Sequence, residues 1–191
     1  TTTGGAANVL SKLEDYLQTE WPELDVYLTS VTDHYSTASI CGPNSKKILK
    51  KIFPDKDFSD DAFPHMSYQN GKIDEINCRI MRISFTGELS YEINIESKYG
   101  KSLWEKCIEA GKEFKITPYG TETMHLLRAE KGFIIVGQDT DGTMTPIDLQ
   151  MDWIVSKKKY DFIGKRSLYR SDTIREDRKQ LVGLLTDDPN E

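Results

Sequence analysis

Residues 78–95 read CRIMRISFTGELSYEINI and predict the clearest structural unit of the chain, a pair of antiparallel strands. The second half alternates apolar and polar residues, and its apolar members are Leu89, Tyr91, Ile93 and Ile95. A period of two is typical of a strand with one buried face. Thr86-Gly87 supplies a tight turn between strands expected over 78–85 and 89–95.

Outward from this hairpin, apolar residues at three- and four-residue spacing predict helices. They are expected over 6–18, from Gly42-Pro43 to 53, over 103–110, and over 120–131, with a short helix at 162–168. Further strands are expected at 26–28, 37–41, 153–155 and from 181, with an irregular connection over 54–71. This order predicts an α+β fold, with helices on one face of antiparallel sheet and a ferredoxin-like half.

Three parts are expected along the chain. Residues 1–117 form the α+β, ferredoxin-like part, 118–178 form its loop-rich continuation, and 179–191 begin a further unit. The first residues, Thr1-Thr2-Thr3, lack an initiating Met, and the last expected strand starts close to the final residue. We therefore expect a segment of a longer polypeptide, truncated at both ends.

Composition excludes several classes of partner. Of the 191 residues, 37% are apolar and 29% are charged, and the net charge is −6. Without a basic cluster we expect no nucleic acid, and no apolar run approaches the ~20 residues that cross a bilayer. The three cysteines are widely spaced and show no metal-ligand spacing to a histidine, which favours reduced thiols, a cytoplasmic location and no metal site.

Several short motifs carry a family resemblance. In chain order they are Phe85-Thr86-Gly87-Glu88, Tyr119-Gly120-Thr121-Glu122, Leu127 to Gly132, Gly137 to Asp141 and Phe162 to Arg166. In this order the chain resembles the folate-binding aminomethyltransferase family, whose type member is the T-protein of the glycine cleavage system. Within it, the C-terminal region of heterotetrameric sarcosine oxidase alpha subunits looks most similar. The resemblance implies a folate-binding domain over 1–178 and the start of a truncated C-terminal β-barrel at 179–191.

Glu88 is the first candidate site residue. A carboxylate at the tip of a hairpin can accept two parallel hydrogen bonds from the 2-amino group and ring N–H of a pterin. By itself the residue also fits a solvated turn carboxylate. The resemblance favours the binding role, because the Thr-Gly-Glu turn matches the family's pterin-binding glutamate.

Arg128 is the second candidate. A guanidinium on a mostly apolar helix needs an anionic or carbonyl partner, and a structural ion pair with Glu130 or Glu92 is the alternative to a ligand. The resemblance implies a folate-site arginine at this position. Tyr91 and Phe85 flank Glu88 and are expected either to stack on the folate or to pack in the core.

Other residues receive no catalytic assignment. Asp139 and Asp141 are typical turn formers. The family's aspartate that acts on the folate amine has no match, since Asp33 stands in a different local context. No Gly-x-Gly-x-x-Gly motif is present, so flavin and NAD are expected to bind outside this segment. We therefore predict no catalytic residue within the chain and an inactive isolated segment.

The resemblance implies tetrahydrofolate as cofactor, a small-molecule substrate, and other sarcosine oxidase subunits as partners. The implied activity of the parent protein is oxidative demethylation of sarcosine, with one-carbon transfer to tetrahydrofolate. One alternative is a related dimethylglycine dehydrogenase or free-standing aminomethyltransferase. Another is a noncatalytic module that docks other subunits, and exposed apolar surface also predicts self-association.

Overall fold

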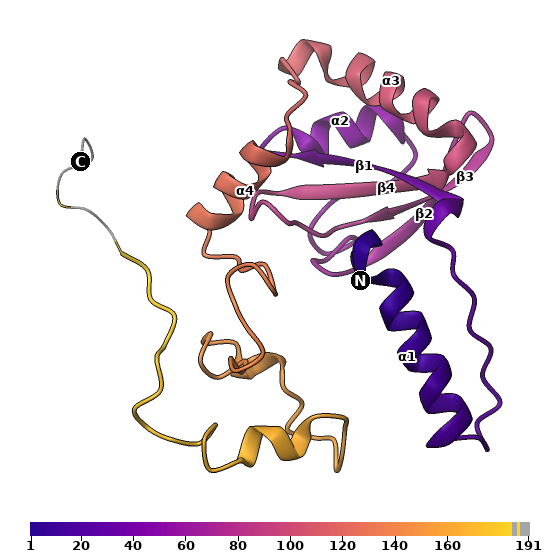
Figure 1. The fold of residues 1–191 in the computed structure, drawn as a ribbon. Coiled ribbons are helices and arrows are strands. Elements are labelled where there is room, and N and C mark those ends of the chain that lie inside the picture. Colours follow the sequence, from indigo (N-terminus) through magenta and orange to yellow (C-terminus); the bar gives the residue numbers. More distant parts are fainter. Residues whose placement is uncertain (185–186, 188–191) are drawn as a thin grey trace. The chain divides into compact units, whose positions relative to one another are not determined.

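The computed structural model describes residues 1–184 and 187 and divides into two compact units, Thr1–Leu127 and Arg128–Glu191 (Figure 1). The first unit contains a four-stranded sheet and the helices α1 (Ala6–Thr19), α2 (Ser45–Ile52) and α3 (Gly100–Gly111). Helix α4 (Thr121–Glu130) crosses the boundary between the units.

The sheet has the strand order β1-β4-β3-β2, and every neighbouring pair is antiparallel. Its strands are β1 (Tyr35–Cys41), β2 (Tyr68–Ile73), β3 (Ile76–Met81) and β4 (Ser90–Glu96). Because β1 and β3 both run antiparallel to β4, they are parallel to each other, and α2 lies in the connection that leads from β1 toward β3. Helix α2 is followed directly by β2, which lies at the other edge of the sheet and runs antiparallel to β1. The predicted α+β class and antiparallel sheet are confirmed.

The core lies between one face of the sheet and the helices α2 and α3, which cover that face in Figure 1. In β4 the alternating residues Tyr91, Ile93 and Ile95 are fully buried, as their period of two predicts. In α3, Leu103 and Cys107 are four residues apart and therefore share the buried stripe. The opposite face of the sheet is polar and carries Glu92 and Asn94.

All three cysteines are free thiols. Cys78 and Cys107 belong to the core, and burial raises the pKa of Cys107 to about 11. Cys41 is only partly buried. A thiol with a raised pKa is protonated at neutral pH and is therefore a poor nucleophile.

The central hairpin differs from its prediction. Pairing of β3 with β4 ends at Met81–Glu92, so residues 82–89 form a loop instead of extending both strands to a tight turn. The Arg82 main chain remains bonded to Met66 and Ser67 beyond the end of β2, at 2.9 and 3.0 Å. The other end of the loop is drawn toward α2, because the Leu89 carbonyl accepts a hydrogen bond from the Gly42 amide at 2.8 Å.

Other boundaries also need correction. The strands expected at 26–28 and 153–155 are absent: Val26 and Tyr27 are exposed, and Asp152–Ile154 is a 3₁₀ turn. The connection expected to be irregular over 54–71 contains the start of β2. Residues 181–184 form no strand, and the rest of that expected strand lies outside the described residues. The short helix near 162–168 is the 3₁₀ helix Lys165–Tyr169.

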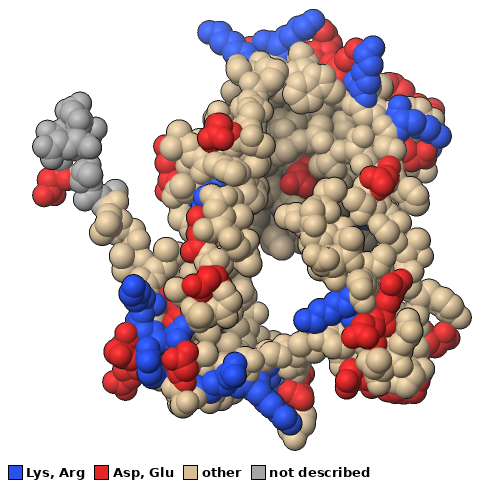
Figure 2. All heavy atoms as spheres, in the orientation of Figure 1, with Lys and Arg blue, Asp and Glu red and all other residues tan. Residues whose placement is uncertain are grey.

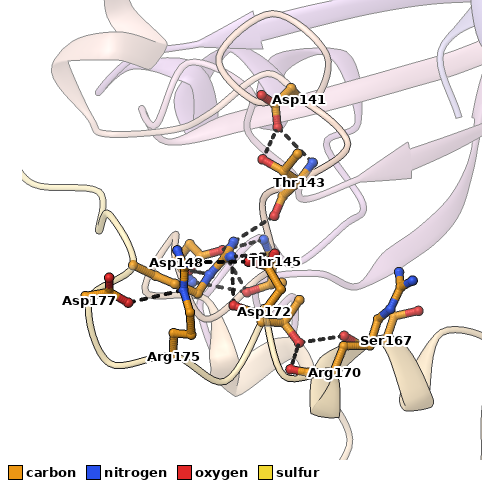
Figure 3. A network of polar contacts seen from close by, with 11 residues as sticks. Asp141, Thr143, Thr145, Asp148, Ser167, Arg170, Asp172, Arg175 and Asp177 are labelled. Atoms are coloured by element: carbon orange, nitrogen blue, oxygen red, sulfur yellow. Dashed lines mark hydrogen bonds and ion pairs between the residues drawn. The ribbon is translucent and has the colours of Figure 1, made fainter.

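The second unit has little regular structure and is held by a polar cluster around Asp148 (Figure 3). The Arg178 guanidinium donates to both Asp148 carboxylate oxygens, at 2.8 and 2.7 Å, and also to the Thr143 carbonyl at 2.7 Å. Thr145 donates its amide to the same carboxylate at 2.8 Å. These hydrogen bonds connect loops that are distant in sequence. In the first unit, the pairing of strands makes the corresponding long-range connections.

Charges are distributed without a basic patch on the face drawn in Figure 2, where Lys and Arg side chains are interspersed with Asp and Glu. Within the part of the chain that the structure describes, no helix combines the length and apolar character needed to cross a membrane.

Candidate functional site

Glu88 lies in the loop 82–89, and its neighbours on both sides are fixed. Thr86 is buried, and its hydroxyl accepts a hydrogen bond from the Glu88 amide at 3.4 Å. Gly87 has φ 79°, a left-handed conformation that glycine adopts without strain. The next residue, Leu89, is held through its carbonyl by Gly42 and by the Ser45 hydroxyl at 3.1 Å.

The Glu88 side chain itself is exposed and forms no ion pair with any described residue. An exposed carboxylate on an anchored loop is available to a ligand without first breaking an internal salt bridge. Its bidentate acceptor geometry suits a pair of adjacent N–H donors. The structure therefore leaves Glu88 free for the binding role that the sequence suggests.

Phe85 and Tyr91 differ sharply in accessibility. The Phe85 ring is 41% exposed and belongs to the same loop as Glu88, so part of the residue is accessible to a planar ligand. Tyr91 is 0% exposed, and its ring centroid lies 5.7 Å from that of Phe63 and 6.1 Å from that of Phe58. In this structure Tyr91 is thus a core residue that packs against the connection between α2 and β2.

The Tyr91 hydroxyl has no hydrogen-bond partner among the described residues, and burial raises its pKa. A buried polar group without a partner costs about 1–3 kcal/mol. We therefore expect Tyr91→Phe to raise the free energy of unfolding by about 1 kcal/mol, measured by urea denaturation. Tyr119→Phe is the contrasting variant, because the Tyr119 hydroxyl lies 3.3 Å from the Cys41 sulfur. A loss of stability in Tyr91→Phe would show that its hydroxyl is satisfied.

Arg128 belongs to the second unit and is 8% exposed. Its guanidinium forms an ion pair with Asp139 and donates to the Phe133 carbonyl at 3.1 Å. Asp139 in turn accepts the Ile135 amide at 2.7 Å. The partner is therefore Asp139, and the arginine closes the loop that follows α4. Its Nε is buried without a partner among the described atoms, so one donor remains unused.

Asp141 acts as a turn former, as expected, because its carboxylate accepts hydrogen bonds from the amide and the hydroxyl of Thr143 (Figure 3). These contacts lower the pKa of Asp141.

The ion pair between Asp148 and Arg178 is not among the contacts predicted from the sequence. No local spacing signals an ion pair between residues so far apart in the chain, and both residues had the appearance of ordinary surface charges.

An apolar cavity of about 440 Å³ lies beside the edge strand β1 in the first unit. It is lined mainly by residues of β1, α2, α3 and the segment 114–121, among them Ile48 and Trp104, together with Met124 of α4. At its rim the Tyr119 hydroxyl meets Cys41, and burial together with Cys41 raises the pKa of Tyr119 to about 12. Tyr119 is therefore a neutral hydrogen-bonding group at physiological pH.

Comparison with known proteins places these features in a family. Residues 1–159 match the family described as GCVT N-terminal domain. The chain is 61% identical over 186 residues to the sarcosine oxidase subunit alpha of Corynebacterium sp. (strain P-1), which covers 97% of this chain and 19% of that protein. The corresponding subunit of Rhizobium meliloti (strain 1021) is 42% identical over 193 residues, covering 100% of this chain and 19% of its own length.

A solved structure shows the same fold. The glycine cleavage system aminomethyltransferase T of Bartonella henselae superimposes with a TM-score of 0.64 at 21% identity, over 82% of this chain and 39% of its own. The chain thus spans about a fifth of the length of the sarcosine oxidase subunits that it matches. Since the family match extends over most of the sequence and the fold agrees, this chain belongs to the GCVT N-terminal domain family of aminomethyltransferase-like proteins.

Proposed function

We propose that this chain is the folate-binding, one-carbon-transfer part of a sarcosine oxidase alpha subunit. The observation that carries the proposal is the anchored loop 82–89, which presents the Glu88 carboxylate without an ion-pair partner among the described residues. The high identity to sarcosine oxidase alpha subunits over nearly the whole chain supports the assignment of the parent protein. The other subunits of such an enzyme are the proposed partners.

In this proposal Glu88 accepts two hydrogen bonds from the 2-amino group and adjacent ring N–H of the pterin of tetrahydrofolate. The Phe85 ring, half-exposed on the same loop, stacks on a planar part of the ligand. Tyr91 packs in the core, in the strand that follows this loop. Tetrahydrofolate supplies the amine nitrogen that accepts the one-carbon unit.

Arg128 contributes through the second unit. Its pairing with Asp139 fixes the loop after α4, so its proposed contribution to folate binding is to hold that loop in place. The role of the chain's own residues is thus to bind and orient the cofactor, so that the one-carbon unit meets a positioned amine before it meets water. Oxidation of the N-methyl group takes place at a flavin bound outside this segment.

The test is calorimetric titration of the chain with tetrahydrofolate, with Glu88→Gln beside the wild type. The substitution keeps the shape of the side chain but replaces one acceptor oxygen by a donor that faces the pterin N–H groups. We expect at least a tenfold rise in Kd, which corresponds to about 1.4 kcal/mol or more.

Glu75→Gln is the matched control, because Glu75 is an exposed turn carboxylate between β2 and β3 of the same sheet. It is expected to leave the Kd of tetrahydrofolate unchanged. Equal affinities of wild type and Glu88→Gln would contradict the role of Glu88. Absence of binding by the well-folded chain would contradict the assignment of a folate site to these residues.

A further inference from the structure

Strand β1 is an edge of the sheet, so one side of its backbone is unpaired in the part of the chain that the structure describes. The register with β4 shows which amides lie on that side. Gly42 continues the pairing past Cys41 and donates its amide to the Leu89 carbonyl, and in an antiparallel pair such bonded positions recur at every second residue. The outward-facing amides of β1 are therefore those of Thr37, Ser39 and Cys41.

The two edges of the sheet differ in composition. The other edge, β2, contains Asn70, Gly71 and Lys72, residue types that are depleted in strands or that hinder the addition of a further strand. The β1 sequence, Tyr35 to Cys41, contains no charged residue, proline or glycine. Native proteins rarely leave such an edge open, because its free amides and carbonyls offer a template for another strand. The sheet is therefore suited to continue at β1 and to end at β2.

Helix α3, which contacts β1, has a wider apolar stripe than the four strands cover. Leu103 and Cys107 are buried, whereas the neighbouring Trp104 is 50% exposed. Trp104 lines the cavity of about 440 Å³ beside β1 together with Ile108 and Phe114. A strand added at the usual spacing of about 4.8 Å from β1 would direct its core-side residues into this cavity. The uncovered part of the helix thus lies where a fifth strand would pack.

The segment 114–121 lines the same cavity but does not form this strand. Lys115 has φ 56°, a left-handed conformation that is incompatible with a strand. Pro118 has no amide hydrogen to donate to a neighbouring strand. The segment contacts β1 through side chains, since the Cys41 thiol donates to the Tyr119 hydroxyl at 3.3 Å. The outer backbone groups of β1 are therefore accessible to a strand from elsewhere.

We propose that a further strand, supplied by another part of the sarcosine oxidase alpha-subunit polypeptide, pairs with the outer side of β1 and fills the cavity with apolar side chains. The chain spans 19% of the Corynebacterium alpha subunit that it matches, so most of that polypeptide is available to supply the strand. A strand of the same polypeptide is tethered, and its high effective concentration favours it over a separate chain. The inference rests on the proposed parent protein and does not require folate binding.

The test is hydrogen exchange, measured by mass spectrometry with single-amide resolution, in this chain and in the full-length alpha subunit that contains it. In the chain alone we expect fast exchange at the outward amides of β1 and slow exchange at Ala38, whose amide faces β4. In the full-length subunit we expect the outward amides to exchange at least about tenfold more slowly than in the chain. The outward amides of β2 should remain fast in both samples.

Ser39→Pro removes one outward amide and leaves the bonds to β4 intact, because proline is tolerated on an edge strand where its nitrogen faces outward. In the full-length subunit it is expected to accelerate exchange at Thr37 and Cys41 at least about tenfold. In the chain alone it should leave exchange at Ala38 unchanged. Ser39→Ala is the matched control, because it also loses the contact of the Ser39 and Ser90 hydroxyls at 3.3 Å but keeps the amide.

Fast exchange of the outward amides in the full-length subunit would show that β1 remains an open edge and would overturn the inference. Protection that arises only after assembly with the other subunits would also overturn it, because the strand would then belong to a partner. Protection in the chain alone that increases with its concentration would assign the edge to a second copy, with the same consequence. Folate takes no part in the experiment, so failure of the folate titration and failure of this inference are distinguishable.

Discussion

Phe63→Ala is expected to lower the free energy of unfolding of the first unit by about 3–5 kcal/mol, the range for truncation of a buried phenylalanine. Phe63 is completely buried although it lies in the connection between α2 and β2. Its ring packs against Phe58 at 5.9 Å and against Tyr91 at 5.7 Å between ring centroids. Removing it leaves a cavity directly behind the strand that follows the Glu88 loop.

Urea denaturation followed by far-ultraviolet circular dichroism measures this loss. Phe85→Ala is the control, because Phe85 is also a loop phenylalanine but its ring is half-exposed, so we expect a loss below about 1 kcal/mol. Similar losses for the two variants would mean that the connection between α2 and β2 is not part of the core. A large loss confined to Phe63→Ala would support the packing described above.

Asp148→Asn is expected to destabilise the second unit by about 3 kcal/mol, because it leaves the Arg178 guanidinium without its bidentate anionic partner. Asp148 is 2% exposed, so water cannot replace the lost carboxylate. Hydrogen exchange measures the effect at two amides that bond to this residue, Thr145 to the side chain and Leu181 to the main-chain carbonyl. Both amides are expected to exchange faster.

The same ion pair makes the stability of the second unit depend on pH in the acidic range. Arg178 holds the pKa of Asp148 well below its usual range, so the folded state favours the carboxylate more than the unfolded state does. The stabilisation is therefore complete above a pH of about 4 and declines as the pH falls below it. In Asp148→Asn this decline should be absent.

Asp177→Asn is the control for the ion-pair prediction, since Asp177 is exposed and lies 3.2 Å from Arg175 at the surface. Exposed pairs contribute at most about 1 kcal/mol. Unchanged exchange rates at Thr145 and Leu181 in Asp148→Asn would show that the polar cluster does not hold the second unit together.

Local periodicity predicted the parts of the fold in which one face is buried. The alternation in β4 and the three- and four-residue spacing in α1, α2, α3 and α4 produced elements close to their expected bounds. The length of the central hairpin was wrong, because it depends on hydrogen bonds to Met66, Ser67 and Gly42, which are distant in sequence. Apolar triplets such as 26–28 failed because no neighbouring strand pairs with them.

The candidate site was predictable to a similar extent. The turn motif placed Glu88 in an exposed loop, and the alternation in β4 predicted the burial of Tyr91. The partners of Tyr91 could not be predicted, because Phe58 and Phe63 lie in a connection that carries no strand or helix pattern. The helix pattern showed that Arg128 needs a partner, although it could not select Asp139 over nearer acids.

The double hydrogen bond to the Leu89 carbonyl makes the Glu88 loop mechanically continuous with the start of α2. Helix α2 is seated in the core through Ile48, Leu49 and Ile52. The position of the exposed Glu88 carboxylate therefore depends on how the buried side chains of α2 pack in the core. A core substitution that shifts α2 by a fraction of an ångström would therefore also shift Glu88, although every residue of the loop stayed the same. Affinity for the proposed ligand is thus expected to depend on core packing in this unit.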